Sequence, residues 1–193
     1  MFCKTVKKKS KNSVNYGLLV NNFVTDPEKF KAAGVAFTNG VHVLAGYQPH
    51  KKHPSISGIG GSREPGESYM QTALRECVEE LFEPTSVPKR LLPKLAQIAP
   101  QKVTQSGSYI NAIYSFDDLQ AMLAIMKRAG LRSPMYVTFP KNLTELIMNR
   151  VATSAISSDK AAEISHLALL PVVAQAADTL MDPYFVADMP AFM

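Results

Sequence analysis

Residues 60–83 of the chain read GGSREPGESYMQTALRECVEELFE, and this stretch decides how the rest of the sequence is interpreted. Its second half predicts a helix over residues 68–82, capped by Ser68 and ended by Pro84. Apolar residues recur at helical spacing on one face: Met70, Ala73, Leu74, Cys77 and Leu81. Four glutamates at i, i+3, i+4 and i+7 share another face: Glu76, Glu79, Glu80 and Glu83. Because the apolar face must be packed, we expect the carboxylates to line solvent or a cleft.

Four like charges on one helix face repel one another, and a bound cation relieves that repulsion. Oxygen-only ligands suit a hard ion, Mg²⁺ or Mn²⁺. Mg²⁺ held by few carboxylates keeps positions for water and substrate phosphates, an arrangement that serves attack by water on a phosphorus–oxygen bond. The alternative interpretation is a solvated acidic helix face that binds nothing.

The loop before the helix favours the first interpretation. Its glycines allow a close approach of the backbone to a partner: Gly58, Gly60, Gly61 and Gly66. Glu67 directly precedes the helix, and Arg75 lies within it. An arginine inside an acidic patch pairs with a carboxylate and can hold the loop against the helix.

These residues carry a resemblance to a known family. The pattern G-x5-E-x7-R-E-U-x-E-E, in which U is bulky and apolar, is the signature of the Nudix hydrolases. It is met by Gly61, Glu67, Arg75, Glu76, Cys77, Glu79 and Glu80. The chain departs from the signature at Phe82 and Glu83, where the family has a glycine and an apolar residue, and Ile59 stands where a proline is frequent.

The resemblance implies roles for individual residues. Glu79 and Glu80 would be the main metal ligands, with the carbonyl of Gly60 completing the site, and Glu76 would be a further ligand or the base. Arg75 and Glu67 would form the ion pair that orients the helix. The family often takes another acid from outside the signature, for which Glu163 is the first candidate and Asp159 the second.

Cations beside the glycine-rich loop are candidates for substrate binding. Lys51, Lys52 and Arg63 are placed to meet outer phosphates, together with the backbone at Gly61. The alternative for the three cations is that they only keep the loop soluble.

The remaining sequence mixes strands and helices, as α/β folds do. Asn39-Gly40 predicts a hairpin over residues 34–47. Further strands are expected at residues 14–24, 95–103, 108–116, 135–139 and 164–170, and further helices at 28–33, 117–129, 142–152 (with an Asn142/Glu145 capping pair) and 172–180. The family resemblance implies an α/β/α sandwich with a mixed β-sheet. Residues 117–160 exceed a minimal family domain and are interpreted as a helical insertion, whose apolar stripes belong either to the core or to substrate access.

Composition describes an ordinary globular chain of 193 residues, with 46% hydrophobic and 19% charged residues. We expect a basic arm at residues 1–13 and a single domain over residues 14–193. Two cysteines exclude a disulfide framework, and no apolar run is long enough for a membrane span. With no secretory signal in the first residues, we expect a reducing, cytoplasmic location.

The expected function is Mg²⁺-dependent (or Mn²⁺-dependent) cleavage of a pyrophosphate bond in a nucleoside diphosphate linked to another moiety. The net charge of +5 and the lysine-rich arm keep open a second reading, an mRNA-decapping or RNA 5′-end pyrophosphohydrolase. A third is a non-catalytic Nudix-fold subunit, structural or RNA-associated. Expected partners are therefore a nucleotide or other diphosphate-containing substrate and, in the second reading, RNA. The family often forms homodimers.

Overall fold

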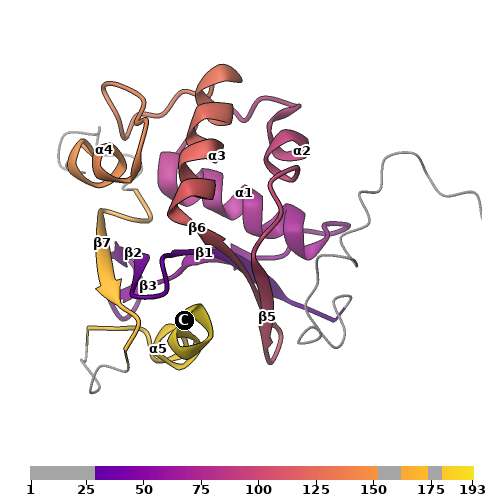
Figure 1. Cartoon of the computed structure of the whole chain (residues 1–193), viewed down its shortest axis with the longest axis vertical. Coiled ribbons are helices and arrows are strands. Elements are labelled where there is room, and N and C mark those ends of the chain that lie inside the picture. The colour runs from indigo at the N-terminus through magenta and orange to yellow at the C-terminus, as the bar shows by residue number, and fades with distance from the viewer. Residues whose placement is uncertain (1–28, 152–161, 174–179) are drawn as a thin grey trace, which may run out of the picture.

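The computed structural model describes residues 29–151, 162–173 and 180–193 (Figure 1). Its strands are β1 Ala32–Thr38, β2 His42–Gln48, β3 Ser55–Ser57, β4 Ile59–Ser62, β5 Lys102–Ser106, β6 Tyr109–Ser115 and β7 His166–Pro171. Its helices are α1 Tyr69–Phe82, α2 Leu91–Leu95, α3 Phe116–Arg128, α4 Leu143–Met148 and α5 Pro183–Asp188, followed by the 3₁₀ helix η3 Met189–Phe192. Within these ranges, no helix is long and apolar enough to cross a bilayer.

The seven strands form one mixed sheet, with β1 near its centre. β1 is parallel to β6 along one edge, while its other edge is shared by β4 and β2, both antiparallel. The Asn39-Gly40 turn joins β1 to β2, and Gly40 has the left-handed backbone conformation (φ 80°) that this turn requires. The predicted hairpin and the predicted α/β class with a mixed sheet are therefore confirmed.

Helices cover both faces of the sheet, as Figure 1 shows with α1 and α3 on one side and α5 on the other. β1 serves both layers because its side chains alternate: Val35 and Phe37 pack in the α1/α3 core, and Ala36 packs in the α5 core. Phe185 and Met189 fill the α5 side. This is the expected α/β/α sandwich.

The helix predicted over residues 68–82 is present as α1. Ser68 caps it by accepting a hydrogen bond from the backbone of Gln71, whose side chain in turn accepts from the Ser68 N–H. Cys77 is fully buried on the apolar face. The helix ends at Glu83, which takes the left-handed conformation (φ 45°) and therefore leaves the row of helical glutamates.

Several local predictions are wrong because tertiary pairing overrides local propensity. Of the helix expected at 28–33, residues 29–31 form no helix, and Ala32 and Ala33 begin β1 and pair with β4. Of the strand expected at 95–103, Leu95 ends helix α2, residues 96–101 are turns and loop, and only residues 102–103 belong to a strand, β5. Residues 135–139 hold only an isolated bridge from Tyr136 to Arg150. The predicted helix at 142–152 ends at Met148.

Other predictions are met in part or lie outside the described residues. Asn142 does cap α4 by accepting from the N–H of Glu145, but the Glu145 carboxylate accepts from the N–H of Lys141 and not from that of Asn142. The basic arm 1–13, the strand at 14–24 and Asp159 lie outside the described ranges, as does most of the helix predicted at 172–180.

The apolar stripe of α3 belongs to the core. Its fully buried side chains are Leu119, Met122, Leu123 and Met126. We expect Met122→Ala to lower the free energy of unfolding by about 2–5 kcal/mol, because it leaves a cavity between α3 and the sheet. The exposed neighbour Gln120 supplies the control, for which alanine should change stability by less than about 0.5 kcal/mol. Urea denaturation measures both, and equal effects would contradict the assignment.

Candidate active site

The site begins where β4 passes close to its neighbours. Gly60 pairs with Gly34 across the sheet, and a Cβ on Gly60 would overlap the Gly34 backbone and the hydroxyl of Tyr109. A Cβ on Gly61 would lie 2.5 Å from the carboxyl carbon of Glu76. At Gly60 the overlap is with backbone, so only glycine fits there, whereas a side chain at Gly61 would have to displace the Glu76 carboxylate. The close backbone approach expected from the sequence is therefore made to β1 and α1.

The carboxylate of Glu80 is buried between α1 and the sheet, with 1% of its surface exposed. Its Oε2 accepts the N–H of Gly60 at 2.8 Å, and its Oε1 accepts the side-chain amide of Gln48 at 2.9 Å. The Gln48 carbonyl in turn accepts from the hydroxyl of Ser57 at 2.8 Å. The expectation that all the glutamates face solvent or an open cleft is therefore wrong for Glu80, which joins α1 to β2, β3 and β4.

Arg75 ties the loop to the helix. Its Nε and Nη2 bind the two carboxylate oxygens of Glu67 at 2.8 and 3.1 Å, which is the predicted ion pair in bidentate form. Its Nη1 donates to Glu76 at 2.7 Å and to Glu79 at 2.9 Å. Its Nη2 also donates to the backbone carbonyl of Ser62 at 2.7 Å. One guanidinium thus fixes the end of β4, the loop and the first half of the acidic face.

Burial and the charges of neighbouring carboxylates raise the pKa values of the acids outside this ion pair. Burial raises the pKa of Glu80 well above its usual range, and burial likewise raises the pKa of Glu76. The carboxylate of Glu163 raises the pKa of both further, so the structure places this predicted outside acid within electrostatic reach of the helix. The backbone N–H of Glu163 donates to the carboxylate of Glu83 at 2.8 Å. Glu83, no longer a helical residue, therefore holds the segment that carries Glu163.

Arg150 holds the same segment from the other side. Its guanidinium donates to the carbonyls of Leu81 at 2.6 Å and Glu80 at 3.2 Å, two of the last carbonyls of α1. It also donates to the carbonyl of Ile164 at 2.8 Å and to the hydroxyl of Tyr136 at 3.1 Å. Arg150 thereby satisfies helix carbonyls that lack intrahelical partners and fixes the residue next to Glu163.

Oxygen donors of the kind that a hard divalent cation prefers are present on α1 and on β4. They are the carboxylates of Glu76, Glu79 and Glu80 and the carbonyl of Gly60. Among the described residues, however, no three acidic, histidine or cysteine side chains gather about one point. Arg75 holds one oxygen of Glu76 and one of Glu79, and both oxygens of Glu80 accept hydrogen bonds within the protein. The donor types fit the ion, and Glu79, whose side chain is 47% exposed, is the ligand with room to turn toward it.

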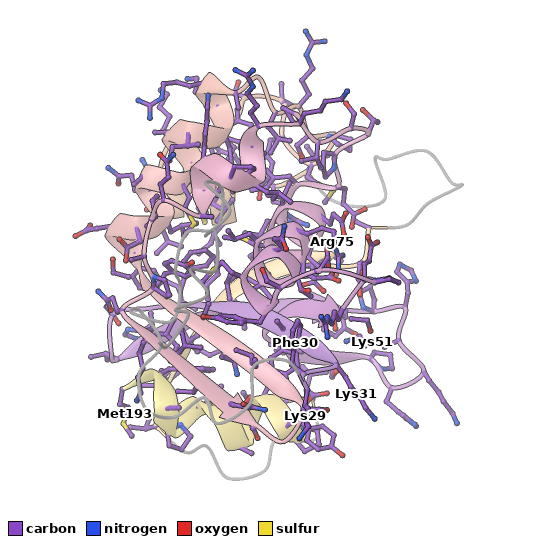
Figure 2. The ribbon with its side chains drawn as sticks, turned by 90° about the vertical axis from the view of Figure 1, so that its right-hand side faces the viewer. Lys29, Phe30, Lys31, Lys51, Arg75 and Met193 are labelled. Carbon is purple, nitrogen blue, oxygen red and sulfur yellow. The ribbon has the colours of Figure 1, made fainter. Side chains whose placement is uncertain are left out.

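The three cations predicted to bind substrate have different surroundings in the structure. Lys51 lines a cavity of about 590 Å³ that also contacts Gly60. Arg63 is engaged elsewhere: its guanidinium lies 4.4 Å from the ring centroid of Phe30, and its Nε donates to the carbonyl of Glu67. Lys52 is exposed and is not among the residues that line this cavity. Figure 2 labels Lys51 together with Arg75 and Phe30.

Three residues that support the site carry no signal in the sequence. Gln48, Ser57 and Arg150 belong to no recognisable motif. Each acts through a partner distant in the chain, which local spacing does not reveal.

Comparison with known proteins gives matches only among solved structures. No protein-family model and no curated protein matches the chain. A bifunctional NMN adenylyltransferase/ADP-ribose pyrophosphatase of Francisella tularensis, in complex with AMP and a manganese ion, is 20% identical with a TM-score of 0.32, over 49% of this chain and 29% of that one. This chain thus spans less than a third of that protein.

Two further matches cover more of the chain. The Nudix hydrolase RenU of M. smegmatis is 14% identical over 84% of this chain and 83% of that chain, with a TM-score of 0.38. A Nudix hydrolase of Nitrosomonas europaea is 16% identical over 73% and 72%, with a TM-score of 0.31. At identities below 25% and TM-scores below 0.5, these similarities leave the function of the chain to its own side-chain geometry.

The Arg75–Glu67 pair predicts a pH-dependent stability. Burial alone would raise the pKa of Glu67, but hydrogen bonds from Arg75, the Glu64 N–H and Thr72 bring it below its ordinary value. The ionised form is thus favoured by folding, and its stabilisation is present above the unfolded pKa, about 4.3, and lost as pH falls through the lower folded pKa. We expect Glu67→Gln to cost about 1–3 kcal/mol at pH 7 and less below about pH 4.

Urea denaturation of both proteins across pH 3–7 measures this difference. Glu64→Gln is the matched control, since the Glu64 side chain lies on the same loop but is exposed. A cost for Glu67→Gln that is independent of pH, or equal to that of the control, would contradict the role given to the pair.

Proposed function

We propose that this chain is a Nudix hydrolase, a divalent-metal-dependent enzyme that cleaves a phosphoanhydride bond in a nucleoside diphosphate linked to another moiety. One observation carries the proposal: a glycine-rich strand and an acidic helix are locked together by Arg75 and by the buried Glu80, while Glu76, Glu79 and Glu163 stay at the edge of that contact. An acidic helix face that only contacts solvent and binds nothing would need neither the closely packed glycines nor a buried carboxylate.

The metal would be held by Glu76, Glu79, Glu80 and the carbonyl of Gly60, with Mg²⁺ as the first choice and Mn²⁺ as the second. When bound, such an ion neutralises phosphate charge and lowers the pKa of a coordinated water. The role of Arg75 is to keep Glu67 and the loop in place and to hold Glu76 and Glu79 on the acidic face of α1.

The hydrolytic step needs a carboxylate that accepts a proton from water. The oxygen of the water forms a bond to phosphorus, the bridging P–O bond breaks, and the bridging oxygen leaves with the second phosphate. Glu163 is our first choice for the base, because it lies outside the Arg75 network yet within electrostatic reach of Glu76 and Glu80. Glu76 is the second choice, since one of its oxygens is already bonded to Arg75.

The test is metal-dependent turnover by the full chain on a panel of nucleotide sugars, dinucleoside polyphosphates, nucleoside triphosphates and capped RNA. We expect Glu79→Gln to lower kcat/KM by about 100-fold or more, as loss of a ligand or of a proton-transfer group does. Its melting temperature should hardly change, because the Glu79 side chain is 47% exposed and its one bond is to Arg75. Glu80→Gln is a poorer probe, since the buried Glu80 also supports the fold.

Glu64→Gln is the control for turnover as well, and should retain wild-type activity. Turnover unaffected by Glu79→Gln would contradict the assignment of the site. No metal-dependent turnover on any member of the panel would contradict the enzyme itself and favour the non-catalytic subunit. If capped RNA is the best substrate, the result favours an RNA 5′-end pyrophosphohydrolase, in which the basic residues 1–13 attract the polyanion.

A further inference from the structure

The cavity of about 590 Å³ lies between the sheet and α5, on the opposite side of the sheet from α1. Its volume is in the range of small-molecule binding sites. It meets the candidate active site at Gly60, which lines the cavity and whose N–H is bound by Glu80. Lys51 also lines the cavity, and its charge acts on Glu80. The cavity and the α1 site share Gly60, so a substrate whose phosphates lie beside Gly60 would have this cavity as the neighbouring space for its next group.

A carboxylate with spare acceptor capacity lies in the wall of the cavity. Asp188, at the end of α5, accepts the side-chain amide of Asn111 at 2.9 Å and a hydrogen bond from the side chain of Ser106. An ionised carboxylate has about four acceptor positions, so two remain for a ligand. Burial raises the pKa of Asp188, and the hydrogen bonds from Asn111 and Ser106 oppose that rise because they favour the ionised form. The same two bonds hold the acceptor edge in place before any ligand arrives.

The charges of the cavity wall disfavour a second anionic group. Two acids, Asp182 and Asp188, line it with one cation, Lys51. The hydroxyl of Tyr109 also lines the cavity and stays protonated, because burial and the charges of Glu80 and Asp188 raise the pKa of Tyr109. The wall therefore suits a group that is neutral and donates hydrogen bonds.

The aromatic rings and the glycine backbone in the cavity wall favour a flat ligand. Phe185 packs its ring edge against Gly58, 3.0 Å from where a Cβ would be, and both residues line the cavity. Tyr184, also in the wall, is 83% exposed, which is unusual for a tyrosine without a partner to cover it. An exposed aromatic ring among the residues that line a cavity offers a face on which a nucleobase can stack.

We propose that this cavity binds the guanine base of a guanosine nucleotide, with the N1–H and N2–H groups donating to Asp188 and the base stacked on Tyr184. Among the common bases, guanine alone presents two adjacent donors on its Watson–Crick edge. Adenine and cytosine each place a ring-nitrogen acceptor beside their one amino donor, and uracil flanks its one donor with two carbonyls. Each of these would set a lone pair against the carboxylate, which carries no proton to donate when ionised.

The inference rests on the proposed function for where the phosphates lie, but its test needs no turnover. Binding of GMP, IMP and AMP to the full chain is measured by calorimetry, with Mg²⁺ and separately with a chelator. The three probes share ribose and phosphate, so differences report the base. We expect GMP to bind about 10- to 100-fold more tightly than AMP, as bidentate recognition does. IMP, which lacks the N2 amino group, should fall between them.

Two variants separate the contribution of the Asp188 hydrogen bonds from that of stacking on Tyr184. Asp188→Asn should bring GMP and AMP within about twofold of each other, since an amide offers one acceptor and one donor to the base edge. Tyr184→Ala should weaken GMP and AMP by the same factor, about fivefold or more, and leave their ratio unchanged. Asp117→Asn removes the same charge from an exposed position on α3 and should change neither value.

Equal binding of GMP, IMP and AMP to the wild-type chain would overturn the inference, and this comparison does not depend on any variant folding. So would an unchanged GMP/AMP ratio in folded Asp188→Asn. Metal-dependent turnover of GTP and ATP at equal kcat/KM, with no base preference in binding, would reject guanine recognition and leave the hydrolase intact. Guanine-selective binding without turnover on any substrate would reject the hydrolase and leave the guanine site.

Discussion

The buried carboxylate of Glu80 is the constraint on which the site depends. A carboxyl group with 1% exposure is tolerated inside a protein only when its hydrogen bonds are satisfied, and here the N–H of Gly60 and the amide of Gln48 do so. Because those partners come from two different strands, α1 has one position on the sheet. The glycines of β4 follow from that position, since a side chain at Gly61 would collide with Glu76.

Two arginines orient the two ends of α1. Arg75 fixes the first half of the acidic face to the loop through Glu67, and Arg150 fixes the last carbonyls of α1 to the segment after Glu163. Each guanidinium bonds several oxygens in a planar arrangement, which a lysine does not reproduce. The consequence is that Glu163, more than 80 residues after Glu80, is held near it without contributing to the core.

The two faces of the sheet serve different chemistry. On the α1 face, the glutamates and the Gly60 carbonyl suit a cation and phosphates. On the α5 face, a cavity lined by two acids and two aromatic rings of α5 and its cap suits a neutral, flat group that donates hydrogen bonds. Gly60 belongs to both faces because it has no side chain to separate them. The reaction is set by one layer of the sandwich and the choice of substrate by the other, so α5 is where specificity is decided in this proposal.

The sequence by itself determined the helix 69–82, its Ser68 cap, the Asn39-Gly40 hairpin, the mixed α/β class and the Arg75–Glu67 pair. These features depend on spacing and on contacts between residues close in the chain, which a pattern records directly. Only the tertiary structure decided that Ala32 and Ala33 are strand, that residues 91–95 are helix, and that Glu80 is buried. It also brought Arg150 and Glu163 to α1 and Asp188 to Asn111. Those outcomes depend on partners tens of residues away, whose pairing energy exceeds local propensity and leaves no periodic trace in the sequence.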